Sequence, residues 1–337
     1  MTKEQKDNLF VLIKSLSKSE KRQFKLYVGR LGVNEDSKFL TLFNILEKLP
    51  FYDESTILKK GVVKKQQLSN LKAHLYKQIL ISLRLNPSHQ NIRIQIREQL
   101  DFATILYHKG LYKQSLKILD KAKSLAIANE EKNIAYEIVE LEKVIESQYI
   151  TRSISSRADE LTIQAKELSQ QNVLASKLSN LSLQLYGLFL KTGYVKNDKE
   201  NKRITKYFND RLPKHDINTL GFREKLWLYK AHLWYSFLTQ DFLACYKYSS
   251  KWVTLFYDSK DQIVLNPVFF LKGNHYLLES LFYLRHYEKF KSTLNDLETI
   301  TKESWFPLDD NVEGLAFLYV YNNKFNLHFI EGSFQEG

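Results

Sequence analysis

The chain has 337 residues, enough for two average domains or for one elongated repeat array. It contains only 11 glycines and 5 prolines, which argues against turn-rich β architectures and favours an all-α fold, and its single cysteine excludes an intrachain disulfide framework. The formal net charge of +12 is concentrated at one end: residues 1–100 hold 19 basic and 9 acidic residues, a net +10, and the remainder hold 31 and 29, a net +2.

The N-terminal stretch does not have the pattern of a targeting segment. Its apolar run from Leu9 to Ile13 has five residues with charges on both sides, which is too short for the core of a signal peptide. No stretch of the chain approaches the ~18 uninterrupted apolar residues that cross a bilayer. We therefore predict a cytoplasmic protein that does not associate with membranes.

Residues 1–86 are predicted to form a small basic helical domain. An apolar stripe that includes Leu9 and Ile13 indicates the first helix. Ser17 and Glu20 have the spacing of a capping box, which predicts the start of a second helix. A third helix is predicted to begin with a cap at Asp36 or Ser37 and to end at Pro50.

A long helix is predicted after a turn at Gly61. Leucine and isoleucine residues at helical spacing mark its apolar side, namely Leu68, Leu71, Leu75, Ile79 and Leu83. The segment "LNPSHQ" ends this helix, because the residue before a proline disfavours the helical region. This predicts two domains, residues 1–86 and residues 87–337.

The second domain contains a degraded repeat. Its best copy, "HKGLYKQSLKILDKA" at residues 108–122, combines a glycine turn, an aromatic residue two positions later and apolar residues at helical spacing. Successive turn positions are spaced 40 to 47 residues apart, which predicts a solenoid of helical hairpins. These positions are Tyr112, a poorer match at Ser155, and then Val195, Phe242, Tyr287 and Phe334.

This unit resembles the tetratricopeptide repeat (TPR), in which a helix A, a tight turn and a helix B form one hairpin. The resemblance implies an all-α fold in which a right-handed α-solenoid follows the basic helical domain. Because the period exceeds the family's usual ~34 residues, longer helices or linkers are expected, and HEAT-like hairpins are the alternative. The first copy carries the resemblance through Phe102, Ala103 and Leu106 on helix A, Gly110 and Tyr112 at the turn, and Ser115, Leu119 and Ala122 on helix B.

The last predicted repeat has a helix A and a turn, but the sequence reaches Gly337 where helix B would begin. A terminal repeat without a polar cap leaves apolar surface uncovered. We therefore expect the array to be truncated, or covered by something else, at this end, and we expect Phe325 and Phe329 to be exposed.

No catalytic motif is present. The sequence lacks the phosphate-binding, nucleophile-elbow and zinc-protease patterns, and its eight histidines include no pair three to five residues apart. We therefore expect no enzymatic activity, no metal and no cofactor. The alternative is a site assembled across repeats from His232, His275 or Cys245 with carboxylates.

Binding of a protein or peptide is the predicted function. Trp227, Lys230 and Trp234 lie on one helix face, where a cation between two aromatic rings would suit an extended peptide. The competing interpretation is that both tryptophans belong to the core. The TPR resemblance places helix A on the concave face of the array and thereby implies a set of peptide-binding residues, namely Arg97, Lys143, Trp227, Lys230, Trp234, Lys272, His275, Asn322 and Asn326.

The alternative function is regulation through nucleic-acid binding by residues 1–86. A short helix, a glycine turn and a basic helix have the outline of a helix-turn-helix. Lysines give mainly salt-sensitive phosphate contacts, and no arginine is placed to read base edges. The candidate contacts are Lys64, Lys65, Lys72 and Lys77.

Overall fold

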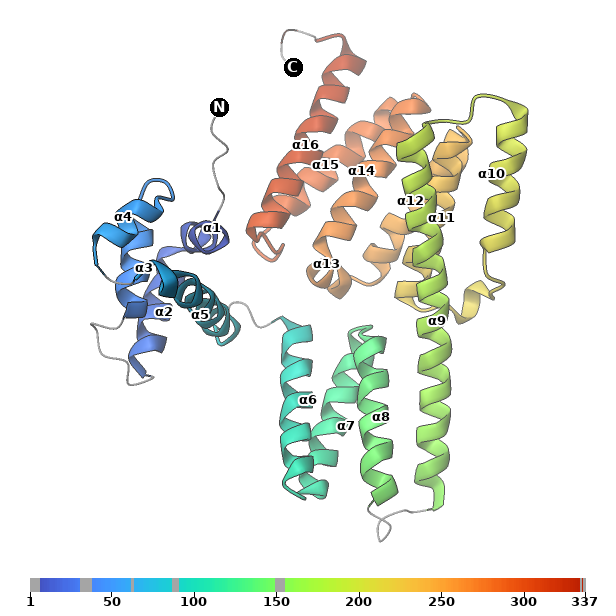
Figure 1. Cartoon of the computed structure of the whole chain (residues 1–337). Coiled ribbons are helices and arrows are strands. Elements are labelled where there is room, and N and C mark those ends of the chain that lie inside the picture. The colour runs from blue at the N-terminus through green and yellow to red at the C-terminus, as the bar shows by residue number, and fades with distance from the viewer. Residues whose placement is uncertain are drawn as a thin grey trace. The chain divides into compact units, whose positions relative to one another are not determined.

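The computed structural model describes residues 7–30, 38–61, 64–86, 91–148, 155–333 and 335. In these residues the chain forms α-helices and one short 3-10 helix and contains no β-strand (Figure 1). The predicted all-α class is therefore confirmed. The chain divides into two compact units, Met1–Glu98 and Gln99–Gly337.

The first unit is a small helical domain. Its core consists of the predicted apolar stripes, with Ile13, Phe43 and Leu75 fully buried. The rings of Phe24 and Phe43 pack at 4.8 Å between centroids, which joins the second and third helices. The helices are α1 (Asn8–Ser15), α2 (Lys18–Arg30), α3 (Lys38–Lys48), α4 (Glu54–Lys59) and α5 (Lys65–Arg84).

The predicted capping box at the start of α2 is confirmed. The backbone N–H of Ser17 donates to Oε2 of Glu20 at 2.7 Å, and the N–H of Glu20 donates to Oγ of Ser17 at 3.2 Å. Gly61 has a φ of 70° and provides the predicted turn after α4. The predicted caps Asp36 and Ser37 lie outside the described residues.

The boundary predicted after residue 86 falls between α5 and the next helix, α6 (Ile92–His108). The two compact units divide between residues 98 and 99, within α6.

The second unit is a succession of packed helices. In chain order, α7 packs on α8, α8 on α9, α9 on α11, α11 on α12 and α12 on α14, while α14, α15 and α16 pack on one another. The helices are α7 (Tyr112–Ala128), α8 (Lys132–Gln148), α9 (Ser155–Thr192), α10 (Asp198–Arg211), α11 (Phe222–Leu238), α12 (Phe242–Asp258), α13 (Asp261–Leu265), α14 (Pro267–Tyr283), α15 (Tyr287–Lys302) and α16 (Asp310–Glu331).

Three of the predicted hairpin turns share one backbone motif. Gly110, Gln240 and Arg285 each have a left-handed φ, of 73°, 59° and 58°, and each stands two residues before a new helix. The next N–H closes a hydrogen bond across the end of the preceding helix, as from Leu111 to the carbonyl of Leu106 at 2.9 Å. Tyr112, Phe242 and Tyr287 begin α7, α12 and α15, as the turn positions predict. Phe334 lies outside the described residues.

A fourth turn of the same kind was not predicted. Glu130 has a φ of 60°, and the N–H of Glu131 donates to the carbonyl of Ala126 at 2.8 Å, between α7 and α8. No glycine marks this turn. Gln240 and Arg285 lack a glycine as well, but an aromatic residue follows each of them two positions later, whereas Lys132 stands at that position after Glu130.

The helix α9 departs from the predicted hairpin pattern. The repeat places the end of one helix B and the start of the next helix A between Ser155 and Val195, but α9 runs through this region as one helix of 38 residues. Gly187 is its first glycine and it contains no proline, so nothing in its sequence ends the helix earlier. Its two ends pack on different neighbours, α8 and α11 (Figure 1).

The first repeat copy brings its two helices close together. The hydroxyl of Ser115 on α7 donates to the carbonyl of Ala103 on α6 at 2.8 Å, and both residues are fully buried. Leu119 and Ala122 are buried as well. Phe102, expected to help pack this hairpin, has 44% of its surface exposed.

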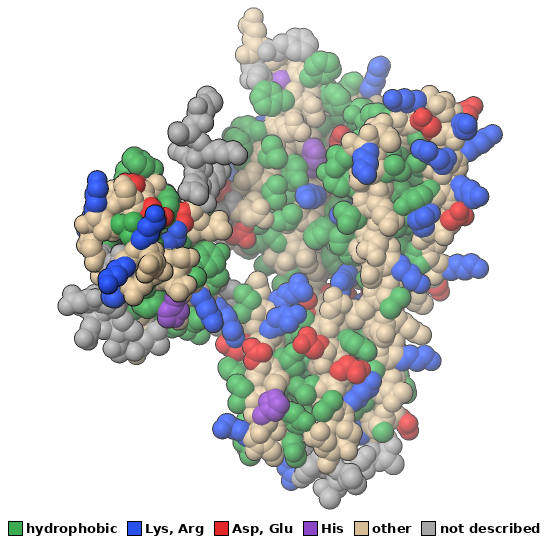
Figure 2. Space-filling view, viewed as in Figure 1, with side chains coloured by type: hydrophobic (Ala, Val, Ile, Leu, Met, Phe, Trp, Pro, Cys, Tyr) green, Lys and Arg blue, Asp and Glu red, His purple; other side chains and the backbone are tan. Residues whose placement is uncertain are grey.

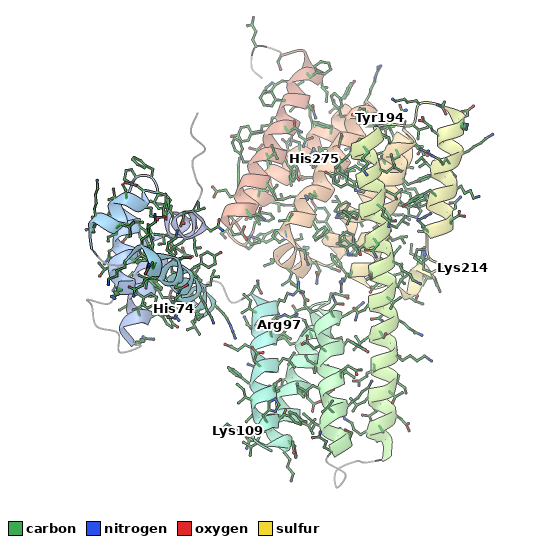
Figure 3. The ribbon with its side chains drawn as sticks, in the orientation of Figure 1. His74, Arg97, Lys109, Tyr194, Lys214 and His275 are labelled. Carbon is green, nitrogen blue, oxygen red and sulfur yellow. The ribbon has the colours of Figure 1, made fainter. Side chains whose placement is uncertain are left out.

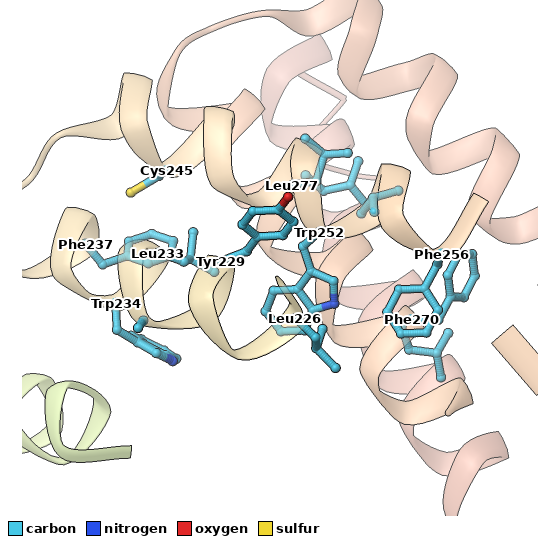
Figure 4. Close-up of a cluster of buried hydrophobic side chains, with 14 of the residues drawn as sticks. Leu226, Tyr229, Leu233, Trp234, Phe237, Cys245, Trp252, Phe256, Phe270 and Leu277 are labelled. Atoms are coloured by element: carbon cyan, nitrogen blue, oxygen red, sulfur yellow. The ribbon is translucent and has the colours of Figure 1, made fainter. Parts of the chain in front are cut away.

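The main core of the second unit lies among α9, α11, α12 and α14. Trp252, Phe256 and Phe270 are completely buried at its centre (Figure 4). At the end of the chain, the prediction for Phe325 and Phe329 on α16 is confirmed, because 58% and 64% of their surfaces are exposed. Figure 2 shows hydrophobic side chains gathered along the C-terminal half of this helix.

Candidate binding cavity

A cavity of about 330 Å³ lies between α9, α11 and α14 in the second unit. It gathers four of the predicted concave-face residues, Trp227, Lys230 and Trp234 from α11 and Lys272 from α14. We call it the aromatic–lysine cavity. The remaining lining residues are Ser179, Asn180, Ser182, Leu183 and Tyr186 from α9 and Tyr276 from α14.

The walls of the cavity are aromatic rings held by the core. The ring of Trp234 packs against Tyr186 at 4.6 Å and against Tyr276 at 5.3 Å between centroids, so it joins α9, α11 and α14. Trp227 packs edge-to-face on Phe269 at 5.6 Å. Trp234 is only 6% exposed and belongs to the core, as the competing interpretation proposed, but it also lines the cavity. The cavity wall at Trp234 is therefore part of the core.

Lys230 points its ammonium group toward aromatic rings. Nζ lies 4.5 Å from the ring centroid of Trp227, 5.2 Å from that of Phe269 and 5.8 Å from that of Trp252. These are cation–π distances. The sequence suggested Trp227 and Trp234 as the two rings around this cation; the structure instead places it over Trp227, Phe269 and Trp252.

The charge of Lys230 is poorly compensated. Burial lowers its pKa to about 8, and the positive charge of Lys272 lowers it further in the same direction. Neither lysine forms an ion pair or a hydrogen bond with a residue in the described part of the chain. The cavity is therefore a positively charged site with aromatic walls.

His275, on the same helix as Lys272, faces a different neighbour. Its ring stacks on Tyr319 of α16 at 4.7 Å between centroids, and Nδ2 of Asn323 lies 3.3 Å from its Nδ1, between α14 and α16 (Figure 3). Burial lowers the pKa of His275 to about 4, so the imidazole is neutral near pH 7. It does not line the cavity.

The other predicted concave-face residues do not line the cavity. Asn322 on α16 is exposed and Asn326 is half-buried. On α8, Lys143 pairs with Glu140, with 2.7 Å between Nζ and Oε1. Arg97 belongs to the first compact unit.

The groups proposed for an assembled catalytic or metal site are individually buried in packing contacts. The ring of His232 stacks on Tyr248 at 4.2 Å, and its pKa is lowered to about 4, mainly by burial. Cys245 is fully buried, and burial raises the pKa of its thiol, which keeps it in the unreactive protonated form. In the described part of the chain, no three His, Cys, Asp or Glu side chains converge as metal ligands would.

The predicted basic helix of the first unit is α5. Lys64, Lys65 and Lys77 are exposed. Lys72 is engaged within the unit: it pairs with Asp7, and Nζ donates to the hydroxyl of Tyr52 at 2.8 Å. These four lysines therefore do not form one free basic row.

A cleft of about 410 Å³ between α2 and α5 was not predicted. Arg22 and Arg30 line it, together with Leu26, Tyr27 and Leu85. The two arginines are eight residues apart and therefore share one face of α2.

The α9 wall of the aromatic–lysine cavity was also missed by sequence reasoning. Ser179, Leu183 and Tyr186 lie more than 40 residues before Trp227, and only the packing of α9 on α11 brings them together. The spacing of 179, 183 and 186 along one helix face was the available signal.

In comparisons with protein-family models, curated proteins and solved structures, no significant match was found. Among the helices that the structure describes, none combines the length and the apolar composition needed to cross a membrane.

Proposed function

We propose that this protein is a non-catalytic cytoplasmic scaffold whose second unit is a TPR-like array that binds a peptide segment of another protein. The recurring left-handed turns at Gly110, Gln240 and Arg285 support the hairpin repeat, because each reverses the chain between two helices. The long helix α9 is the main irregularity in such an array.

The aromatic–lysine cavity is the observation that carries this proposal. Its lining comes from three helices, and rigid aromatic rings with a few polar groups are what anchors a peptide side chain. Its volume of about 330 Å³ is at the low end of ligand pockets, roughly 300–1,000 Å³, and suits one or two side chains. Among the lining residues, only the two lysines carry a charge near pH 7.

Selection of peptides from a random library on the whole immobilised chain tests this function. We expect an enriched set of peptides whose affinity falls on the order of tenfold in Tyr186→Ala, because that ring lines the cavity. Tyr76→Ala is the matched control, since both tyrosines are 37% exposed and Tyr76 lies in the other unit. Failure to enrich peptides above the uncoated surface, or equal loss in both variants, would contradict the proposal.

A second candidate function is binding of nucleic acid by the first unit. The cleft lined by Arg22 and Arg30 favours it, because arginine suits phosphate and base-edge recognition better than lysine does. Exposed Lys64 and Lys65 add positive charge to the same unit.

Titration of the whole chain with duplex DNA and with single-stranded RNA at several salt concentrations tests this candidate. We expect binding that weakens steeply as salt rises and that is lost when Arg22 and Arg30 are replaced by glutamine. Binding that Arg22→Gln and Arg30→Gln leave unchanged would exclude the cleft as the site.

A further inference from the structure

The aromatic–lysine cavity lacks a counter-charge for its two ammonium groups. Lys230 is largely buried, and neither it nor Lys272 has an acidic partner among the described residues. A buried ammonium group is costly unless an anion compensates it. Such a charge is retained at an expense in stability, which points to a ligand that supplies the missing anion.

The acidic residue nearest along α14 does not fill this role. Glu279 stands seven residues after Lys272, and its pKa is raised to about 6 by burial. Burial is the only cause of this shift, with no contribution from a cation, and Glu279 forms no ion pair or hydrogen bond with either lysine. Glu279 is therefore not the partner of either lysine, and the lysines remain available to a ligand.

We propose that the cavity receives an acidic side chain of the bound peptide, with its carboxylate between Lys230 and Lys272. An aromatic side chain next to it in the peptide packs against Tyr186 and Trp227. This inference rests on the peptide-binding function proposed above. It specifies that the recognised peptide residue is acidic. Because the carboxylate belongs to a side chain, the bound segment does not have to include the C-terminus of the partner.

Small aromatic compounds test whether the cavity recognises a negatively charged group, independently of peptide binding. Phenylacetate combines a ring with a carboxylate, and phenylacetamide is its neutral isostere. The probes are titrated into the whole chain at pH 7 and low salt, with calorimetry and the fluorescence of the cavity tryptophans as readouts. We expect phenylacetate to bind at least tenfold more tightly than phenylacetamide, because its negative charge adds an ion-pair attraction to the two ammonium groups that the neutral amide oxygen does not supply.

Lysine variants locate the binding. Lys230→Gln and Lys272→Gln should each weaken phenylacetate binding on the order of tenfold. Lys206→Gln is the control, because Lys206 is exposed on α10 and does not line the cavity. Circular dichroism and melting confirm that each variant is folded. Equal binding of phenylacetate and phenylacetamide, or unchanged affinity in both cavity variants, would overturn the inference while leaving peptide binding itself intact.

A pair of capped peptides tests whether the carboxylate in the cavity comes from a peptide side chain. The peptide acetyl-Gly-Ser-Phe-Glu-Gly-Ser-amide has no free terminus, and replacement of its Glu by Gln gives the matched control. Tighter binding of the Glu peptide than of both the Gln peptide and phenylacetate supports the proposal. If phenylacetate binds but the Glu peptide binds no better than the Gln peptide, a peptide side chain is not the occupant. If phenyl phosphate binds at least tenfold more tightly than phenylacetate, the recognised group is phosphoryl and not carboxylate.

Discussion

Nζ of Lys123 on α7 lies 2.6 Å from Oε2 of Glu142 on α8, and the side chain of Glu142 has no exposed surface. Arg157 on α9 reaches the other oxygen of the same carboxylate at 3.2 Å. One buried acid therefore ties three consecutive helices together.

Glu142→Gln should destabilise the second unit by about 3 kcal/mol, because it leaves the buried ammonium group of Lys123 with only the more distant carboxylate of Asp120, at 3.8 Å. Glu140→Gln removes an exposed pair on the same helix and should cost less than about 1 kcal/mol. Urea denaturation of both variants measures the difference. Equal urea midpoints in the two variants would show that the buried carboxylate of Glu142 contributes no more to stability than the exposed carboxylate of Glu140.

Gly273 on α14 lies against the indole of Trp252. A Cβ at position 273 would come within 2.9 Å of Nε1 and 3.0 Å of Cδ1 of this fully buried ring. Gly273→Ala should therefore destabilise the protein by about 2 kcal/mol through overpacking. Gly187→Ala is the control inside α9, where nothing lies within 4 Å of the added carbon, and it should stabilise by about 0.5–1 kcal/mol through helix propensity. The melting temperature should therefore fall in Gly273→Ala and rise in Gly187→Ala, which thermal denaturation measures.

Lys230→Met should stabilise the free protein at pH 7 by about 2 kcal/mol, because it removes a charge that burial disfavours. The pKa of Lys230 is about 8 in the folded chain, below its ordinary value of 10.5. Between these values the unfolded chain binds more protons, so the stability of the native sequence rises with pH. The gain from Lys230→Met should thus shrink between pH 8 and pH 10. If Lys230→Met stabilised the protein by the same amount at pH 8 and at pH 10, the ammonium group of Lys230 would not be an uncompensated buried charge.

The buried histidines should make the second unit sensitive to acid. The pKa of both His232 and His275 is lowered to about 4, mainly by burial, whereas the ordinary value is 6.5. As pH falls from 6.5 to 4, the unfolded chain takes up protons that the folded chain does not, so stability falls.

The variant His232→Phe keeps an aromatic ring beside Tyr248 and Phe208 and removes the titrating group. We expect it to recover about 2 kcal/mol of the stability lost between pH 6.5 and pH 4. Denaturation midpoints at intervals of half a pH unit provide the measurement. The same acid sensitivity in His232→Phe and in the native sequence would exclude His232 as a cause.

The sequence by itself determined the helical class, most of the apolar stripes and three of the turns. These features depend on neighbours in the chain: the hydrogen bonds between Ser17 and Glu20 span three residues, and the turn at Gly110 needs a residue that tolerates positive φ. Such local signals are readable without knowledge of the partner helix. The turn at Glu130 was missed because Lys132 stands two positions later, where the three predicted turns have an aromatic residue.

Only the tertiary structure decided what the aromatic and basic residues do. Trp227, Lys230 and Trp234 share a helix face in the sequence, but the packing of α9 and α14 decides which rings meet the cation and which line a cavity. Lys72 looked like a phosphate contact until folding placed Asp7 and Tyr52 beside it. Burial and ion pairing depend on residues tens of positions away in the chain. These residues determine the free energy of a charged side chain in the folded protein.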